Sequence, residues 1–116
     1  MPIYIVDDNS DLSEFLSCLL TDIGYTTHSF SHPSDAIAHM QKTRQKPSIL
    51  ITDYNLPAMN GFELHLKALS LFENIKTIVI SGRNVSEKIG KLHFLQKPFS
   101  PDEIAQLIQS IKTNDE

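Results

Sequence analysis

The chain has 116 residues, of which 41% are apolar and 21% charged, and its formal net charge at pH 7 is −4. This length fits one domain with a single core, and the composition excludes collagen-like, low-complexity and disulfide-rich proteins. A mildly acidic chain without a basic stripe is not expected to bind nucleic acid or anionic membranes directly. The single cysteine, Cys18, excludes an intrachain disulfide and a cysteine-based metal site, and its apolar helical context predicts a buried side chain.

The first predicted elements are a strand and an amphipathic helix. Residues 3–6 are apolar and mostly β-branched, which suits a strand buried on both faces. A helix follows, with Asn9 or Ser10 as its N-cap and Gly24 as its C-terminal stop. The apolar residues that predict its buried face are Leu12, Phe15, Leu16, Leu19, Leu20 and Ile23.

The middle of the chain repeats this order. Residues 26–30 predict a more polar strand near a sheet edge, and a second helix begins at Pro33 and ends before Pro47. Residues 48–53 predict another strongly buried strand. After a loop at 54–61, the third predicted helix carries an apolar repeat at Phe62, Leu66 and Leu69.

The last third of the chain predicts two more strands and a final helix. The strands lie at 76–82 and 93–96, and the polar stretch between them, residues 83–91, allows at most a short helix. Pro101 begins the final helix. Its apolar face is predicted at Ile104, Leu107, Ile108 and Ile111.

Five alternations of strand and helix predict an α/β fold, with a parallel sheet covered by helices on both faces. The architecture that fits is a doubly wound, flavodoxin-like sheet in the order 2-1-3-4-5, with a short or irregular fourth helix and one domain over residues 1–116. In this order ligands bind where strands 1 and 3 end.

Aspartates stand at the ends of both of these strands. Asp7 and Asp8 follow the first strand and Asp53 ends the third, so the fold predicts three carboxylates in one crevice. Like charges this close raise one another's pKa, and a hard divalent cation such as Mg²⁺ relieves the repulsion. Each aspartate alone could be a simple turn-former, but the convergence of three favours a metal site.

Two further polar residues end strands at the same edge. Ser81 closes the fourth strand and Lys97 closes the fifth, where a hydroxyl and an ammonium could bind an anionic ligand opposite the metal. Pro98 restricts Lys97 to an extended backbone, which helps to aim its side chain back across the sheet edge.

With these residues in this order, the chain resembles the receiver domain of two-component response regulators over essentially its whole length. The segment from Asp53 to Gly61 matches the family's D-x-x-[ML]-P-x-M-[DN]-G loop closely. The resemblance implies the flavodoxin-like receiver fold. It also implies a signalling domain rather than an enzyme acting on a metabolite. The first ten residues lack the basic start and long apolar stretch of a signal peptide, so the cytoplasm is the expected location.

The resemblance implies a role for each site residue. Asp53 would accept a phosphoryl group from a histidine kinase or phosphotransfer protein. Asp8 and Asp53 would ligate Mg²⁺ through their side chains and Asn55 through its backbone carbonyl, whereas Asp7 would act mainly through a metal-bound water.

The resemblance also implies a switch. Lys97 would bind one phosphoryl oxygen and Ser81 would hydrogen-bond another after a small inward shift. Phe94 matches the aromatic position whose rotamer follows Ser81, although a simple core role on its strand is the alternative. Repacking of Phe94 would change the surface of strands 4 and 5 and the final helix for a downstream protein or a fused output domain.

One departure from the family bears on function. Ser81 and Lys97 are 16 positions apart, fewer than the family typically has, and the missing residues belong to the fourth helix. A phosphorylation-independent docking module is therefore the alternative function. A haloacid-dehalogenase-type phosphohydrolase fits poorly, because Asn55 stands where that family needs a second aspartate. A flavodoxin fits poorly too, because Asp7 and Asp8 would repel the flavin phosphate.

Overall fold

The protein is described from a computed structural model, which defines residues 2–114. Its centre is a five-stranded sheet in the order β2-β1-β3-β4-β5, and all four strand pairs are parallel. The predicted α/β fold and strand order are therefore confirmed. The strands are β1 (Ile3–Val6), β2 (Thr27–Phe30), β3 (Ile49–Asp53), β4 (Lys76–Ser81) and β5 (His93–Gln96).

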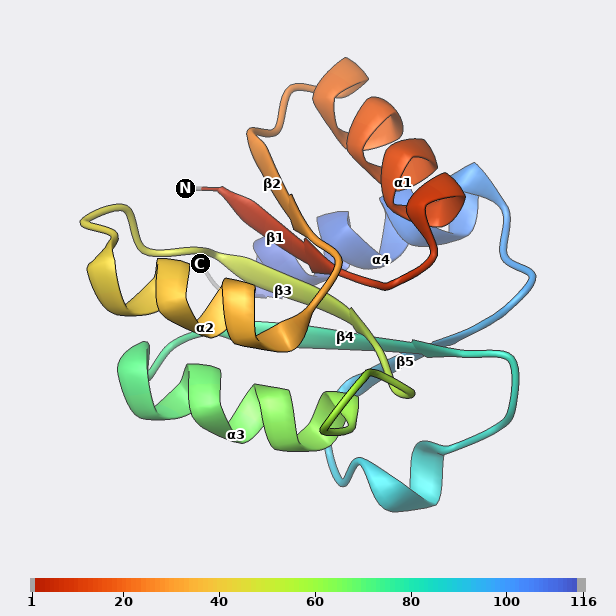
Figure 1. Cartoon of the computed structure of the whole chain (residues 1–116). Coiled ribbons are helices and arrows are strands. Elements are labelled where there is room, and N and C mark those ends of the chain that lie inside the picture. Colours follow the sequence, from red (N-terminus) through yellow and green to blue (C-terminus); the bar gives the residue numbers. More distant parts are fainter. Residues whose placement is uncertain (1, 115–116) are drawn as a thin grey trace.

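Four helices flank the sheet, two on each face (Figure 1). They are α1 (Ser10–Asp22), α2 (Pro33–Lys42), α3 (Gly61–Leu71) and α4 (Pro101–Asn114). The segment between β4 and β5 contains only one turn of 3-10 helix, η1 (Ser86–Lys88), as the polar sequence there predicts. Local signals explain the helix starts, because the Asn9 side chain caps α1 and Asn60 forms a capping box with Glu63 at α3.

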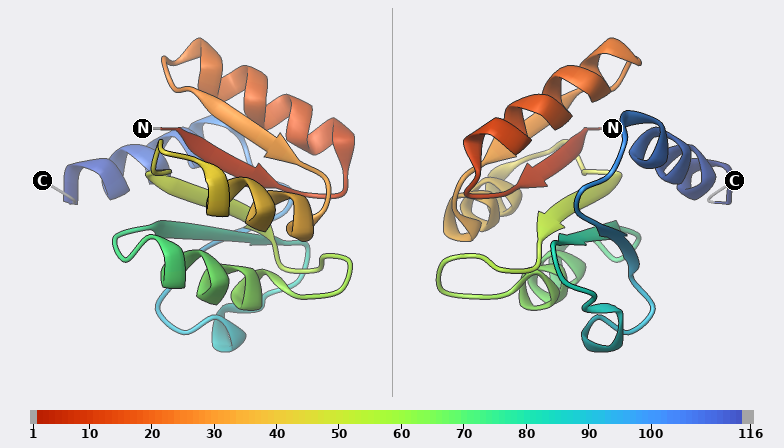
Figure 2. Two further views of the ribbon diagram at one scale, coloured as in Figure 1. Left: turned by 60° about the vertical axis from the view of Figure 1, so that its left-hand side comes forward. Right: turned by 90° about the vertical axis from the view of Figure 1, so that its right-hand side faces the viewer.

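One face of the sheet is covered by α1 and α4, and the right-hand view of Figure 2 shows both helices on the same side of the strands. Alternate residues of β1, β3 and β4 point to this face, because side chains alternate along a strand. They meet the buried sides of the two helices in one continuous apolar cluster. Its buried members are Ile3, Ile5, Leu16, Leu20, Ile49, Ile51, Ile78, Ile80, Ile104, Ile108 and Ile111.

The opposite face is covered by α2 and α3, and its apolar side chains form two separate clusters. The larger cluster lies between these helices and β1 and β3 and contains Tyr4, Val6, Ala36, Met40, Leu50, Leu64, Ala68 and Ile75. The smaller cluster lies beside β5 under the segment 83–92. Its buried members are Val79, Val85 and Ile89, and Tyr54, Phe62, Leu92 and Phe94 pack against them.

The predicted buried faces of α1 and α3 are partly wrong. In α1, Phe15 is 39% and Ile23 48% exposed, and Cys18 is exposed rather than buried, because the helix turns the side of Leu16 and Leu20 toward the sheet. In α3, Leu66 is 49% and Leu69 39% exposed. The side of α3 that faces the sheet contains Leu64, His65 and Ala68 instead.

Candidate functional site

Three carboxylates meet at the carboxyl ends of β1 and β3. These strands are adjacent and parallel, with Val6 opposite Thr52, so the residues that follow reach the same edge of the sheet. One carboxylate oxygen each from Asp7, Asp8 and Asp53 lies within 4.8 Å of the other two. The structure thus brings together the three aspartates that the sequence singled out.

Asp7 is the most buried of the three, with 2% of its surface exposed. Its Oδ1 accepts a hydrogen bond of 2.8 Å from the backbone N–H of Asn9, but its buried Oδ2 has no hydrogen-bond partner within residues 2–114. Burial raises the pKa of Asp7 above its ordinary value. The charges of Asp53 and Asp8 raise it further, whereas the Asn9 hydrogen bond and the Lys97 ammonium lower it.

Asp53 is 9% exposed and is held from two sides. Its Oδ1 accepts a hydrogen bond of 3.2 Å from the backbone N–H of Asn55, and its Oδ2 accepts one of 3.2 Å from the Lys97 Nζ. The Lys97 Nζ also lies 3.7 Å from Oδ2 of Asp7. One ammonium therefore contacts two carboxylates and offsets only one of their two negative charges.

The backbone of Lys97 is fixed to the neighbouring strand. Its N–H donates a hydrogen bond of 2.9 Å to the carbonyl oxygen of Ser81, the last residue of β4, which continues the β4–β5 pairing one residue beyond β5. The peptide bond between Lys97 and Pro98 is cis. From this position the lysine side chain reaches across the end of β4 to the end of β3, as the sequence predicts.

A tight loop, residues 54–60, brings Asn55 to the edge of the site. The backbone N–H of Gly61 donates a hydrogen bond of 2.7 Å to the carbonyl oxygen of Tyr54 and closes the loop. A Cβ atom at position 61 would lie 2.6 Å from the backbone oxygen of Asp53, closer than such atoms approach. Glycine is therefore required here by a close backbone contact with Asp53. Sequence reasoning missed this role of Gly61, although a glycine at the end of a loop before a helix is the available signal.

Ser81 ends the strand next to that of Asp53, and Phe94 lies one strand further away, on β5. Ser81 is 1% exposed, and its Oγ accepts a hydrogen bond of 3.1 Å from the backbone N–H of Arg83. Phe94 stands opposite Val79 in the β4–β5 pairing and is half-buried in the small cluster. Among the described residues, no hydrogen bond joins either side chain to an aspartate of the site.

The donor set fits a hard divalent cation. Three carboxylates within 4.8 Å repel one another unless a cation lies between them, and one buried oxygen, Oδ2 of Asp7, has no hydrogen bond. Oxygen-only ligands with room for waters suit Mg²⁺. The structure therefore offers a cluster that could hold a metal at the place where the sequence predicts one.

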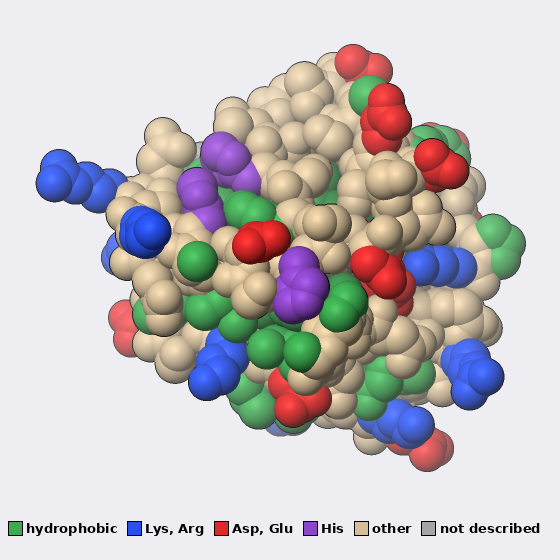
Figure 3. All heavy atoms as spheres, in the orientation of Figure 1, with side chains coloured by type: hydrophobic (Ala, Val, Ile, Leu, Met, Phe, Trp, Pro, Cys, Tyr) green, Lys and Arg blue, Asp and Glu red, His purple; other side chains and the backbone are tan. Residues whose placement is uncertain are grey.

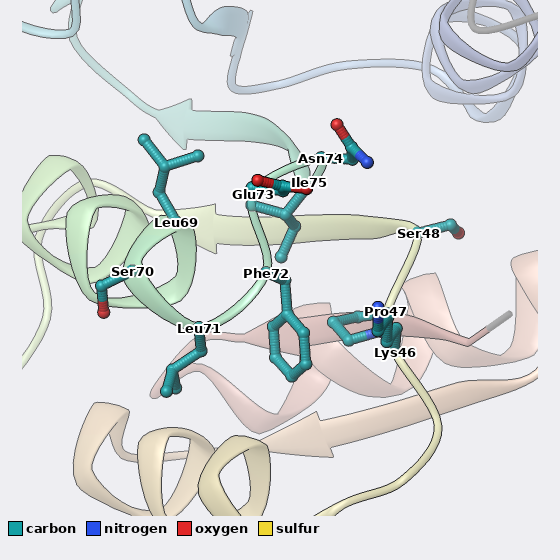
Figure 4. A pocket seen from close by; sticks show the side chains of 10 residues that line it. All are labelled: Lys46, Pro47, Ser48, Leu69, Ser70, Leu71, Phe72, Glu73, Asn74 and Ile75. Carbon is teal, nitrogen blue, oxygen red and sulfur yellow. The ribbon is translucent and has the colours of Figure 1, made fainter.

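A cavity lies away from these residues. It has a volume of about 530 Å³ and is lined by the loops that lead into β3 and β4, including Pro47, Leu71 and Phe72 (Figure 4). Because both strands start there, the cavity opens at the edge of the sheet opposite the carboxylates.

Within residues 2–114, no helix is long and apolar enough to cross a lipid bilayer.

Comparison with known proteins agrees with this geometry. The model of the response regulator receiver domain family matches residues 3–109. The response regulator protein TodT of Pseudomonas putida is 32% identical over 114 residues, a match that covers 93% of this chain and 49% of TodT. The chain spans about a fifth of the Arabidopsis thaliana proteins ARR21 and ARR13 and about a quarter of the transcriptional regulatory protein DctD of Rhizobium meliloti, which it also matches.

Solved structures show the same fold. A response regulator receiver protein from Sinorhizobium medicae superposes with a TM-score of 0.89 at 19% identity, covering 100% of this chain and 97% of that one. The chemotaxis response regulator CheY4 of Vibrio cholerae gives a TM-score of 0.82 at 25% identity, covering 95% of this chain and 97% of that one.

Proposed function

Since the chain belongs to the response regulator receiver domain family of two-component systems, we propose that it accepts a phosphoryl group on Asp53. The observation that carries the proposal is the environment of Asp53. Its carboxylate lies beside two further carboxylates and within 3.2 Å of the Lys97 ammonium. The phosphoryl donor would be a histidine kinase or a phosphotransfer protein.

In the proposed reaction, a carboxylate oxygen of Asp53 attacks the phosphorus of a phosphohistidine on the donor. The new P–O bond to Asp53 forms as the P–N bond breaks, and the bonding electron pair leaves with the donor imidazole, which takes up a proton. Phosphoryl transfer requires an in-line nucleophile and stabilisation of charge on the phosphoryl oxygens rather than elaborate covalent chemistry. Bound Mg²⁺ would supply part of that stabilisation. Asp8, Asp53 and the backbone carbonyl of Asn55 would hold it, with Asp7 acting through water.

Lys97 has two roles in this proposal. Before transfer it orients Asp53 and offsets its charge through the 3.2 Å contact. After transfer its ammonium binds a phosphoryl oxygen, because the new group carries roughly −1.5 to −2 charges by analogy with phosphoesters. The Ser81 hydroxyl binds another oxygen after giving up its contact with the Arg83 N–H.

Phosphorylation would then change the structure of β4 and β5. Movement of Ser81 opens space on the side of β4 where Phe94 packs, and a new Phe94 rotamer changes the surface of β4, β5 and α4. We propose that this surface acts on a downstream protein or on an output domain of a longer chain, in the cytoplasm. The single domain proposed here covers residues 1–116. One matched relative, DctD of Rhizobium meliloti, is described as a transcriptional regulatory protein.

Intact mass spectrometry tests the proposal. The chain is incubated with acetyl phosphate and Mg²⁺, alongside a sample with EDTA and the Asp53→Asn variant. We expect one added phosphoryl group that is absent from both controls. Labelling of Asp53→Asn at the same stoichiometry would reject the site.

A second variant tests the role of Lys97 separately. Lys97→Ala is expected to bind Mg²⁺ with little change, because a lysine is not a metal ligand, but to lose the phosphorylation-driven shift of Ser81 and Phe94. Amide and methyl NMR spectra with and without phosphorylation measure that shift. If phosphorylation changes the NMR spectra of this variant as it changes those of the unaltered protein, Lys97 does not couple the phosphoryl group to Ser81 and Phe94.

A docking module that works without phosphorylation is the second candidate. The observation that favours it is the segment 83–92, in which a single 3-10 turn, η1, stands in place of a full helix. If Mg²⁺ binds and no phosphoryl group is added, this candidate becomes the better one.

A further inference from the structure

The helix α3 carries an apolar stripe that is patterned like a buried face but is open to solvent. Phe62, Leu66 and Leu69 recur at the spacing of one helix face. Yet Leu66 is 49% and Leu69 39% exposed. Single exposed leucines are ordinary, whereas an exposed stripe next to other apolar side chains marks an interaction surface.

The stripe is continuous with the small apolar cluster beside β5. Phe62 packs against that cluster together with the half-buried Leu92 and Phe94. We name the surface formed by Phe62, Leu66, Leu69, Leu92 and Phe94 the α3–β5 face. On this side of the sheet, α2 packs on β1 and β2 and α3 packs on β3 and β4, but beside β5 there is only the segment 83–92 with its single turn (Figures 1 and 2).

The segment that borders this face is basic, although the whole chain has a net charge of −4. It contains Arg83, Lys88 and Lys91, all exposed, against the single carboxylate Glu87. Across residues 2–114, none of these three cations is part of an ion pair. Figure 3 shows blue side chains beside green ones over the part of the surface formed by η1 and the adjoining end of α3.

We propose that the α3–β5 face docks an acidic amphipathic helix of a partner protein. The helix would lie between α3 and the segment 83–92, beside β5. Its apolar side would meet Leu66, Leu69 and Phe94, and its carboxylates would pair with Lys88 and Lys91. Docking does not require phosphorylation of Asp53, so the proposal does not rest on phosphoryl transfer; it names a surface and a partner for the docking module considered above.

A second copy of the chain is a poorer occupant of this face. The acidic helix of this chain is α1, which contains Asp11, Glu14 and Asp22 and no lysine or arginine. Leu16 and Leu20 of this helix are buried against the sheet, and its exposed large apolar side chains are Phe15 and, at the C-cap, Ile23. A docked copy would therefore offer two separate apolar anchors rather than a continuous stripe to the α3–β5 face.

Titration of two synthetic peptides followed by amide NMR tests the proposal. Both peptides have roughly 16 residues and the same leucine stripe, long enough to form a helix, and differ only in carrying Glu or Lys on the polar flanks. The protein is the Asp53→Asn variant, which cannot be phosphorylated at that residue. We expect the Glu peptide to shift amides of residues 62–69 and 88–94 saturably, and to bind at least about tenfold more tightly than the Lys peptide.

Substitutions on the surface identify the contacts. Leu66→Asp combined with Leu69→Asp is expected to lower the affinity for the Glu peptide by about tenfold or more, because both apolar anchors are lost. The matched control is Leu71→Asp. Leu71 is 41% exposed and lies on the opposite side of the same helix from Phe62, so this substitution is expected to leave the affinity unchanged. Since all three side chains are exposed, the variants should fold, and their amide spectra verify this.

The charge requirement has its own variant. Lys88→Glu with Lys91→Glu is expected to reverse the preference, so that the Lys peptide becomes the tighter ligand. Equal binding of the two peptides, or shifts that map to α1 instead, would overturn the proposal. So would a dimer in analytical ultracentrifugation that Leu66→Asp with Leu69→Asp dissolves, since a second copy would then cover the face.

Discussion

The face of the sheet under α1 and α4 and the face under α2, α3 and η1 bury their apolar side chains in different ways. The first holds one continuous cluster between three strands and two helices. The second is divided, and its part beside β5 has three buried residues under a single 3-10 turn. Ser81 and Phe94 both point to this lightly covered part, since side chains alternate along β4 and β5. Both faces therefore contain a buried apolar core, and the packing is lightest beside β5, where the proposed switch lies.

The largest expected effect contrasts two matched isoleucines. Ile80 in the continuous cluster and Ile89 in the small one are each 1% exposed. Ile80→Ala is expected to cost about 3–4 kcal/mol, because the rigid surroundings cannot close around the cavity. Ile89→Ala is expected to cost about 1–2 kcal/mol, because a single-turn segment can collapse. Urea unfolding measures both, and equal costs would remove the proposed difference between the faces.

The next effect concerns the close contact between Gly61 and the backbone carbonyl of Asp53, the proposed phosphoryl acceptor. Gly61→Ala is expected to lower the free energy of unfolding by about 2 kcal/mol, because the new methyl group meets the Asp53 carbonyl oxygen. It should also slow phosphorylation by displacing Asp53. Gly82→Ala is the control, since a Cβ there has no neighbour within 4 Å, and it is expected to change stability by less than about 0.5 kcal/mol. A Gly61→Ala protein as stable as the control would argue against the close contact.

A smaller effect of opposite sign is expected at Asp7. Its pKa is raised by burial and by its carboxylate neighbours, so the folded state holds the proton more tightly than the unfolded state. The resulting loss of stability develops as the pH rises from about 3.8 through the raised pKa, and it is complete above that pKa. Without metal, Asp7→Asn is therefore expected to stabilise the fold at pH 7 by roughly 1 kcal/mol. The same variant should bind Mg²⁺ more weakly.

Thermal unfolding in EDTA and calorimetric titration with Mg²⁺ measure the two consequences for Asp7. Destabilisation of Asp7→Asn without metal would mean that the Lys97 contact, rather than burial, dominates at this residue.

The smallest effect belongs to His65 on the α3 side of the sheet. His65 is 8% exposed, its Nδ1 lies 2.7 Å from the Thr77 Oγ1, and burial lowers its pKa. The folded state therefore prefers the neutral ring, and stability is lost as the pH falls below about 6.5 toward the lowered pKa. His65→Gln is expected to flatten the dependence of stability on pH between about 7.5 and 5.5. Unchanged pH dependence in urea unfolding would show that the buried ring does not contribute.

Much of the fold could be predicted because local signals and apolar pattern agree. The runs that end at Val6 and Asp53 are fully buried strands, and the caps at Asn9 and Asn60 start helices where the sequence places them. Alternation of strand and helix then leaves few possible topologies.

The exposed stripe of α3 could not be predicted in the same way. Phe62, Leu66 and Leu69 have the spacing of a core-facing side, and periodicity alone does not say which neighbour covers that side. The answer depends on the segment 83–92, which is distant in sequence and too short to form a covering helix. The prediction for Cys18 is wrong for a related reason, because an apolar helix can be apolar on more of its circumference than it buries.

The composition of the candidate site was predictable, but its balance of charges was not. Strand ends and sheet order are enough to place Asp7, Asp8 and Asp53 together. The sequence does not show that one oxygen of Asp7 is buried without a hydrogen bond, or that Lys97 contacts two carboxylates. Those properties depend on side-chain burial and distances of a few ångströms.

The most direct test of phosphoryl acceptance by Asp53 is to locate the phosphoryl group on the chain. After incubation with acetyl phosphate and Mg²⁺, borohydride reduction converts an aspartyl phosphate to homoserine, which peptide mass spectrometry can place. We expect homoserine at position 53 and unaltered aspartate at positions 7 and 8. Homoserine at Asp7 or Asp8, with Asp53 intact, would contradict the proposed acceptor.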